Sequence, residues 1–210
     1  MDIECTGREL FVLNKVAKAA ETLSVPCYLI GGFVRDKLLG RATKDADIVC
    51  IGDGIELAHA VAGMFNPKPS VAYFKNFGTA QIKIPGLEIE FVGARKESYA
   101  EHSRKPAVET GTLEDDLNRR DFTINALAIS LNKEDFGRLL DPFNGVQHLK
   151  EKLIKTPLEP AQTFSDDPLR MMRAVRFSTQ LGFTIEKNTL DAIKEMAECI
   201  KIVSQERITD

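Results

Sequence analysis

Tryptophan is absent from this 210-residue sequence, and cysteine, histidine and long apolar runs are scarce. The four cysteines lie far apart without a C-x-x-C pair, so the sequence predicts neither a zinc site nor a disulfide framework. The three histidines are scattered, and none pairs with a cysteine or serine as a nucleophile would require. No apolar run approaches the roughly 18 residues that span a bilayer. We therefore expect reduced thiols, no membrane segment and a cytoplasmic location.

Other absences narrow the function. The first ten residues, MDIECTGREL, lack the basic start and apolar block of a secretory signal. No G-x-x-x-x-G-K-[ST] loop occurs. The net charge of -3 argues against strong nucleic-acid binding through bulk electrostatics, so any polyanion must be held by a local basic patch. What is present, 43% hydrophobic and 28% charged residues, is typical of a globular protein with one sizeable core or two modest ones.

The order of the predicted elements changes along the chain. Helix patterns cover 8–22, 33–40 and 52–65, and strand patterns cover 27–30, 45–51, 70–74, 79–84 and 87–93. The polar segment 95–113 is predicted to be a loop. From residue 113 the pattern becomes helical, with three helices expected near 158–164, 167–181 and 187–203. These patterns predict a mixed α/β part followed by an all-α end, with a boundary near residue 155.

Acidic residues alternate on two of the predicted strands. Asp45 and Asp47 are two residues apart, so their carboxylates share one face, and two close anions are stable together only beside a cation. A divalent ion such as Mg²⁺ prefers oxygen ligands of this kind. Glu88 and Glu90 also share a face of their strand. If the two strands are neighbours, the acids can close a two-metal site. A D-x-D alone is equally typical of an exposed strand, and spacing leaves Glu88 and Glu90 as alternatives.

A glycine pair, Gly31 and Gly32, stands where a strand gives way to a helix. Backbone N–H groups at such a point can approach a polyphosphate without a side chain in the way. Arg35, one turn into the helix, has a planar fork of donors suited to phosphate oxygens. The alternative for Arg35 is an ion pair with Asp36 or another acid.

Two later stretches concentrate charge. Arg119-Arg120-Asp121 places two cations beside an anion, which is typical of a helix end exposed to solvent. In FSDDPLRMMRAVRF the charged residues recur every third position and cover one half of a helix, with Met171, Met172 and Val175 on the other half: Asp167, Arg170, Arg173 and Arg176. The alternative is an amphipathic helix with ion pairs. Three arginines without matching acids on that helix predict that an external anion compensates their charge.

Six motifs in order carry a family resemblance: GGFVRD, DAD, EFVGAR, RRDFTINA, DPFNG and DDPLRMMRAVRF. Over residues 27–203 the chain resembles the bacterial tRNA nucleotidyltransferases and, more broadly, the poly(A) polymerase group of the DNA polymerase beta superfamily. The resemblance implies an α+β nucleotidyltransferase head with a mixed or antiparallel sheet flanked by helices over 1–154. It implies an all-α neck, or RNA-binding domain, over 155–210. Because members of the family are about twice as long, we expect a fragment that holds only the head and the neck.

The same resemblance implies roles for individual residues. Asp45, Asp47 and Glu90 would be catalytic and hold Mg²⁺, and Gly31, Gly32 and Arg35 would contact the triphosphate. Arg120, Asp121 and Asn125 would line the nucleotide pocket, with Asn125 on sugar or phosphate. Asp167 and Arg170 would read the Watson–Crick edge of the base, and Arg173 and Arg176 would neutralise phosphates. Asp166 departs from the family pattern, because many relatives have glutamate there.

These roles imply a template-independent enzyme that adds C and A from CTP and ATP to the 3′ end of tRNA and releases pyrophosphate. A poly(A) polymerase, a CC-only enzyme and an A-only enzyme are the alternatives within the class, and the polar segment 96–112 bears on the choice between C and A. A catalytically silent nucleotide-binding module is the alternative from another class. It predicts the loss of a metal-binding acid, and all three are present. The sequence does not predict the oligomeric state.

Overall fold

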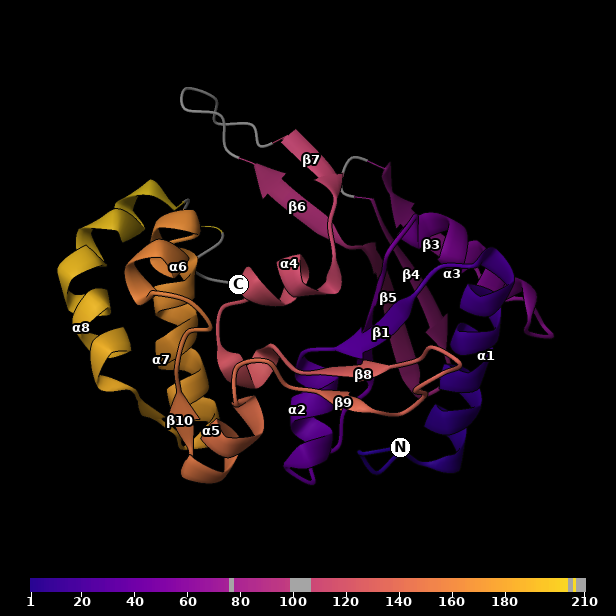
Figure 1. The fold of residues 1–210 in the computed structure, drawn as a ribbon, viewed down its shortest axis with the longest axis horizontal. Helices are drawn as coiled ribbons and strands as arrows, with labels where there is room; N and C mark the ends of the chain where they lie inside the picture. Colours follow the sequence, from indigo (N-terminus) through magenta and orange to yellow (C-terminus); the bar gives the residue numbers. More distant parts are fainter. Residues whose placement is uncertain (76–77, 99–106, 204–205, 207–210) are drawn as a thin grey trace. The chain divides into compact units, whose positions relative to one another are not determined.

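The computed structural model describes residues 1–75, 78–98, 107–203 and 206 (Figure 1). Packing divides the chain into two compact units. The first unit is Met1–Leu117 with Leu127–Leu140, and the second is Asn118–Ala126 with Asp141–Asp210. The division into a head over 1–154 and a helical domain from residue 155 stays a prediction.

The first unit contains a seven-stranded sheet with the strand order β3-β4-β5-β2-β1-β8-β9. Its strands are β1 (Cys27–Ile30), β2 (Asp45–Cys50), β3 (Val71–Phe74), β4 (Thr79–Ile84), β5 (Leu87–Gly93), β8 (Ala128–Ser130) and β9 (Leu139–Leu140). Only the β2–β5 pair is parallel, and the other pairs are antiparallel. The predicted mixed sheet is therefore confirmed.

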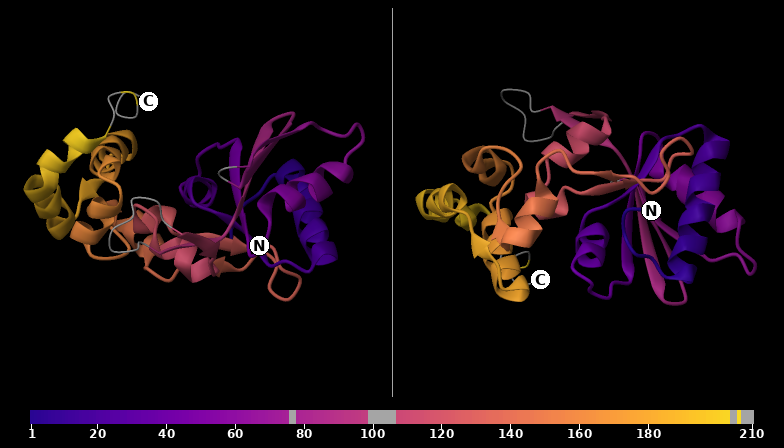
Figure 2. Two further views of the ribbon diagram at one scale, coloured as in Figure 1. Left: turned by 90° about the horizontal axis from the view of Figure 1, so that it is seen from above. Right: turned by 60° about the horizontal axis from the view of Figure 1, so that its bottom comes forward.

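Helices flank this sheet. The helices of the unit are α1 (Gly7–Leu23), α2 (Gly32–Leu38), α3 (Gly54–Gly63) and α4 (Leu113–Asn118). Helix α3 packs on β4 and β5 and against α1, and α2 packs on β1 and β2. Figure 2 shows α1 and α3 together along one side of the sheet. The sheet face toward α3 is apolar and buried, since Ile48 of β2, Ile82 of β4 and Phe91 of β5 are all closed to solvent.

The predicted loop over 95–113 is wrong at its two ends. Strands β6 (Arg95–Ser98) and β7 (Ala107–Thr110) form an antiparallel two-stranded sheet, and Leu113 begins α4. The middle of that segment, residues 99–106, lies outside the described residues, as does part of the segment 96–112 that was expected to bear on the choice between C and A.

The second unit is mainly helical, although the part from residue 155 onward is not all-α as predicted. It contains α5 (Gly145–Glu151), α6 (Pro160–Asp166), α7 (Leu169–Leu181), α8 (Lys187–Met196) and the 3-10 helices η2 (Thr123–Asn125) and η3 (Ala197–Ile202). The exception is a short parallel pair, β10 (Leu153–Ile154) with β11 (Thr184–Ile185), which the sequence does not predict. Part of the core of this unit consists of Phe164, Met171 and Ala192, against which α8 and η3 pack further apolar residues.

Helix α7 faces the core differently from the prediction. Met171 is buried as expected, but Met172 is 44% exposed and Val175 is 50% exposed. Phe177, which does not fit the predicted apolar half, is buried. The buried stripe therefore follows Met171, Ala174 and Phe177 at a spacing of three residues.

Across the described ranges, no helix is both long enough and apolar enough to span a membrane.

Candidate active site

Four carboxylates share one face of the sheet in the first unit. The parallel register of β2 and β5 pairs Asp45 with Glu88 and Asp47 with Glu90. Residues that pair directly, and residues two apart on one strand, point to the same face. These four side chains are half-buried or exposed, whereas the residues between them on both strands are buried. The two strands are thus neighbours, as the metal-site hypothesis requires, and we refer to these four residues as the acidic strip.

Glu88 and Glu90 differ in their partners. Lys83 of β4 pairs in register with Glu88 and places its Nζ 3.0 Å from Glu88 Oε2. Gln81 Nε2 donates to the same oxygen at 3.4 Å. Among the described residues, no hydrogen bond or ion pair engages the carboxylate of Glu90. A cation at Glu88 would compete with this lysine, so the ion pair supports the choice of Glu90 over Glu88, and the metal-binding role itself stays a prediction.

The acidic strip has the donor chemistry of a divalent-cation site. Asp45, Asp47 and Glu90 offer only carboxylate oxygens, which are the ligands that hard cations such as Mg²⁺ prefer. In the described ranges, no three His, Cys, Asp or Glu side chains lie close enough together to hold a metal ion, and this includes the side chains of the acidic strip. The residues present fit such an ion, and the three-ligand geometry itself stays a prediction.

Gly31 makes the turn between β1 and α2. Its φ of 72° and ψ of -132° lie in a region that glycine adopts without a steric penalty. Its N–H already donates to the carbonyl of Leu127 at 3.0 Å. Gly31 therefore shapes the turn and has its own donor in use, and its predicted contact with a triphosphate stays a prediction.

Arg35 lies beside this turn. Its side chain is 8% exposed, and its Nε and Nη2 each donate to one oxygen of Asp36 at 2.9 Å. Its Nη2 lies 3.7 Å from where a Cβ of Gly32 would stand. The ion pair with Asp36, the alternative that the sequence left open, is present, and contact between Arg35 and a triphosphate stays a prediction.

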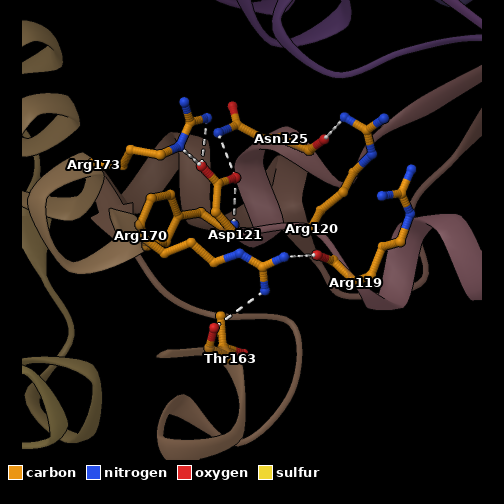
Figure 3. Close-up of polar contacts among 8 residues, drawn as sticks. Arg119, Arg120, Asp121, Asn125, Thr163, Arg170 and Arg173 are labelled. Atoms are coloured by element: carbon orange, nitrogen blue, oxygen red, sulfur yellow. Dashed lines mark hydrogen bonds and ion pairs between the residues drawn. The ribbon is translucent and has the colours of Figure 1, made fainter. Parts of the chain in front are cut away.

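In the second unit, residues 119–125 form a cluster with α7 (Figure 3). We call residues 119–125 the Arg-Arg-Asp segment. Asp121 is 7% exposed and lies at the centre of the contacts. Its Oδ1 accepts from the backbone N–H of Phe122 at 2.8 Å and from Asn125 Nδ2 at 3.0 Å. Its Oδ2 lies 2.8 Å from Arg173 Nε and 2.7 Å from Arg173 Nη2.

The other arginines of this cluster bind backbone carbonyls. Arg170 Nη2 donates to the carbonyl of Arg119 at 2.6 Å, and its Nη1 donates to the carbonyl of Thr163 at 3.2 Å. Arg120 Nη1 donates to the carbonyl of Asn125 at 3.4 Å (Figure 3). The cluster thus brings together the predicted residues Arg120, Asp121, Asn125, Arg170 and Arg173.

Of the remaining two predicted residues, Asp167 lies between α6 and α7, and Arg176 lies on α7 one turn beyond Arg173. Asp167 Oδ1 accepts from the backbone N–H of Leu169 at 3.1 Å, in the first turn. Arg176 is exposed, and its guanidinium lies 5.5 Å from the ring centre of Phe177. Arg173 stacks on the same ring at 5.3 Å. The expectation that the arginines of α7 lack a matching acid is thus wrong for Arg173, whose acid is Asp121.

A histidine and an aspartate that sequence reasoning did not assign support the Arg-Arg-Asp segment and its surroundings. His148 Nδ1 lies 2.9 Å from Thr123 Oγ1. Burial, and then the charge of Lys155, lower the pKa of His148, which favours the neutral ring. Asp141 accepts from the backbone N–H groups of Gly145 at 2.6 Å and Val146 at 3.0 Å, so the DPFNG motif begins α5.

Comparison with known proteins finds relatives that agree with one another in kind. The chain is 45% identical over 168 residues to the A-adding tRNA nucleotidyltransferase of Aquifex aeolicus, which covers 80% of this chain and 20% of that protein. It is 39% identical over 197 residues to the CCA-adding enzyme of Lactobacillus helveticus, covering 93% of this chain and 47% of that enzyme. The chain therefore spans at most about half the length of these relatives.

A solved structure and two family models complete the comparison. The structure of a tRNA nucleotidyltransferase complexed with a primer tRNA and an incoming ATP analogue is similar, with a TM-score of 0.80 and 38% identity over 92% of this chain and 53% of that one. Enzymes of this kind generally use a divalent metal. Residues 182–210 match the model of the probable RNA and SrmB-binding site of polymerase A. Residues 27–155 match the model of the poly A polymerase head domain. Because that match covers more than half of the sequence, the chain belongs to the poly A polymerase head domain family.

Proposed function

We propose that the protein adds C and A from CTP and ATP to the 3′ end of tRNA, with release of pyrophosphate. The single observation that carries this proposal is the register of β2 and β5, which aligns Asp47 with Glu90 on an open sheet face in a chain of this family. The relatives that add A or CCA to tRNA support the choice of substrate. A cytoplasmic location accords with this function and is part of the proposal.

The acidic strip would supply the metal site. Asp45, Asp47 and Glu90 would hold Mg²⁺, which when bound lowers the pKa of the attacking 3′-hydroxyl and stabilises charge on the α-phosphate. Lys83 forms its ion pair with Glu88, so a metal ion at Glu90 would not compete with this lysine. Arg35 would contact the triphosphate from beside the turn that Gly31 and Gly32 form.

The second unit would select the base. Arg170 has five N–H donors in its guanidinium, and the two contacts to Thr163 and Arg119 leave donors for a base edge. Asp167 can accept a hydrogen bond from an exocyclic amino group, which both cytosine and adenine carry. In this scheme Arg176, exposed on α7, would neutralise phosphate charge.

Addition of A alone is the second candidate. It is favoured by a specific observation, because the relative that is 45% identical is an A-adding enzyme. The two candidates share the metal site and differ only in whether CTP is used.

The deciding experiment gives the intact protein two tRNA substrates with Mg²⁺ and each labelled nucleoside triphosphate in turn. One tRNA ends before CCA and the other ends in CC. Incorporation of C and then A supports CCA addition, and incorporation of A into only the second tRNA supports A addition. Long A tracts on unrelated RNA would indicate a poly(A) polymerase. No incorporation on either tRNA would contradict the proposal and favour a silent nucleotide-binding module.

Variants of the acidic strip test the metal site. Asp47→Asn and Glu90→Gln should each lower the rate of transfer by about 1,000-fold, because a metal ligand supplies several kcal/mol of transition-state stabilisation. Circular dichroism should show that both variants remain folded. The matched control is Glu88→Gln, which should keep nearly full activity. Loss of activity in Glu88→Gln together with normal activity in Glu90→Gln would reverse the assignment.

A further inference from the structure

A lysine of α2 forms an ion pair with a glutamate at the start of α1. Lys37 Nζ lies 2.7 Å from the carboxylate of Glu9, and the two side chains are only 12% and 11% exposed. The same carboxylate accepts from the backbone N–H of Thr6 at 2.7 Å, which completes the capping box that begins α1. Lys37 Nζ also lies 5.3 Å from the ring centre of Phe33, one turn earlier on α2. The pair thus joins the last turn of α2 to the first turn of α1.

Both members of this pair are charged although water reaches little of either side chain. Burial acts to raise the pKa of Glu9, but the hydrogen bonds from Lys37 and Thr6 outweigh it, so the pKa lies below its ordinary value. The carboxylate is therefore ionised at neutral pH. Removal of one partner would leave a poorly hydrated charge without a counter-ion, whereas removal of both would not. The pair is therefore a firm link between the two helices.

The helix that this link fastens is the one expected to contact the triphosphate. Helix α2 begins at the turn made by Gly31 and carries Arg35. Arg35 and Lys37 are two residues apart, which is about 200° around a helix, so Lys37 holds α2 from the side away from Arg35. Because α2 has only seven residues, a shift of its last turn would also move Arg35.

We propose that Lys37 and Glu9 are positioning residues for triphosphate binding. Their ion pair holds α2 at the start of α1 and so sets where the guanidinium of Arg35 meets the phosphates, without contact between the pair and the nucleotide. This inference rests on the proposed function and deepens it, because that function assigns no role to either residue.

The test measures the affinity of the intact protein for ATP and for AMP by calorimetry, with Mg²⁺ and without tRNA. The two nucleotides share the base, the sugar and the α-phosphate, so the ratio of their dissociation constants reports contacts with the β- and γ-phosphates. Lys37→Met should lower the preference for ATP by about 10-fold, the loss expected when a charge-assisted hydrogen bond is weakened. The affinity for AMP should be nearly unchanged. An unchanged preference would mean that packing on β1 and β2 suffices to place α2, and would overturn the inference.

The double variant of Glu9→Gln with Lys37→Met separates positioning from stability. It leaves no buried charge without a partner, so it should recover much of the stability to urea that Lys37→Met loses. Its preference for ATP should stay low, because the link between the helices is still missing. Recovery of both properties would mean that the pair acts on stability alone and would overturn the inference. If Lys37→Met does not fold, the double variant carries the test.

An exposed ion pair on the same helix provides the matched control. Lys133 Nζ lies 3.0 Å from Glu21 Oε1 near the other end of α1, and the side chains are 77% and 40% exposed. Lys133→Met also removes a lysine from a glutamate of α1, but it should leave both affinities unchanged, because exposed pairs contribute little. An equal loss of ATP preference in this control would show that general charge, and not the position of α2, is responsible, and would reject the inference.

A transfer assay on the unsubstituted protein separates this inference from the proposed function. If that protein transfers no nucleotide but prefers ATP to AMP, the proposed function fails and Lys37→Met still decides the role of the pair. A lost preference then supports the pair, and a retained preference rejects it. If the unsubstituted protein does not prefer ATP, α2 makes no triphosphate contact to be positioned, and the inference is rejected whatever the transfer assay gives.

Discussion

Cys27 and Cys50 are opposite each other on β1 and β2, and solvent reaches neither side chain. Burial raises the pKa of each thiol from 9.0 to about 12. The neighbouring Cys50 raises the pKa of Cys27 further, and Asp53 raises the pKa of Cys50 further. Both thiols therefore stay protonated in the folded protein at a pH where an unfolded chain has already released the protons.

The stability of the protein should fall as the pH rises above about 9, because the unfolded state then binds fewer protons than the folded state. Each thiol should contribute a slope of about -1.4 kcal/mol per pH unit to the free energy of unfolding between its unfolded and folded pKa values. Urea unfolding at several pH values between 8 and 11 measures this slope. In Cys27→Ala the slope should be shallower by that amount.

Val49→Ala is the control for the cavity that Cys27→Ala creates. Val49 is also buried on β2 but has no titrating group, so its substitution should lower stability equally at each pH. An unchanged slope in Cys27→Ala would mean that its pKa is not raised by burial.

Single residues also show what the sequence does and does not reveal. The alternation of Asp45 with Asp47 and of Glu88 with Glu90 is visible in the sequence, because a strand has a period of two. The choice between Glu88 and Glu90 depends on Lys83, which lies on a third strand. The contact of Asp121 with Arg173 joins residues 52 positions apart, so no local pattern predicts it.

At the scale of elements, the long strands of the sheet were predictable and the polar hairpin was not. Strands β4 and β5 match their predicted bounds because apolar residues alternate and Pro85-Gly86 marks the turn between them. Strands β6 and β7 lie in a polar segment without such alternation, and their pairing decides their structure. Strands β10 and β11 have two residues each, which is too short for any periodic signal.

The start of α3 illustrates an element-scale constraint that the sequence hides. A Cβ on Gly54 would lie 2.9 Å from the backbone N of Gly93 and 2.9 Å from the carbonyl carbon of Val92, at the end of β5. The helix can approach the strand this closely only because residue 54 has no side chain. In the sequence, this glycine predicts only a turn before the helix.

Gly54→Ala should therefore destabilise the protein by about 1–3 kcal/mol, because the helix or the strand must shift to relieve the clash. The control is Gly63→Ala in the last turn of the same helix, where nothing lies within 4 Å of the new Cβ. Gly63→Ala should be neutral or stabilising by up to about 1 kcal/mol. Urea denaturation of both variants checks the difference, and equal stabilities would refute the packing argument.

At the scale of the whole molecule, the two packing units do not follow a single cut in the chain. Residues Asn118–Ala126 pack with the second unit, and the chain then returns to the first unit over Leu127–Leu140. The change from mixed to helical patterns predicts a boundary near residue 155, and such a change cannot reveal a segment that crosses between units. The contacts of Asp121 and Thr123 with residues of the second unit are what assign that segment.

Metal binding is the property on which the proposed activity of the whole protein depends. Mg²⁺ can be replaced by Mn²⁺, whose position is visible through its anomalous scattering. The most direct measurement is a crystal structure of the intact protein with Mn²⁺ and a non-hydrolysable CTP analogue. We predict anomalous density bound by Asp45, Asp47 and Glu90, with Glu88 still paired to Lys83. Density at Glu88 alone, or none at the acidic strip when the nucleotide is bound, would contradict a metal-dependent nucleotidyltransferase built on these strands.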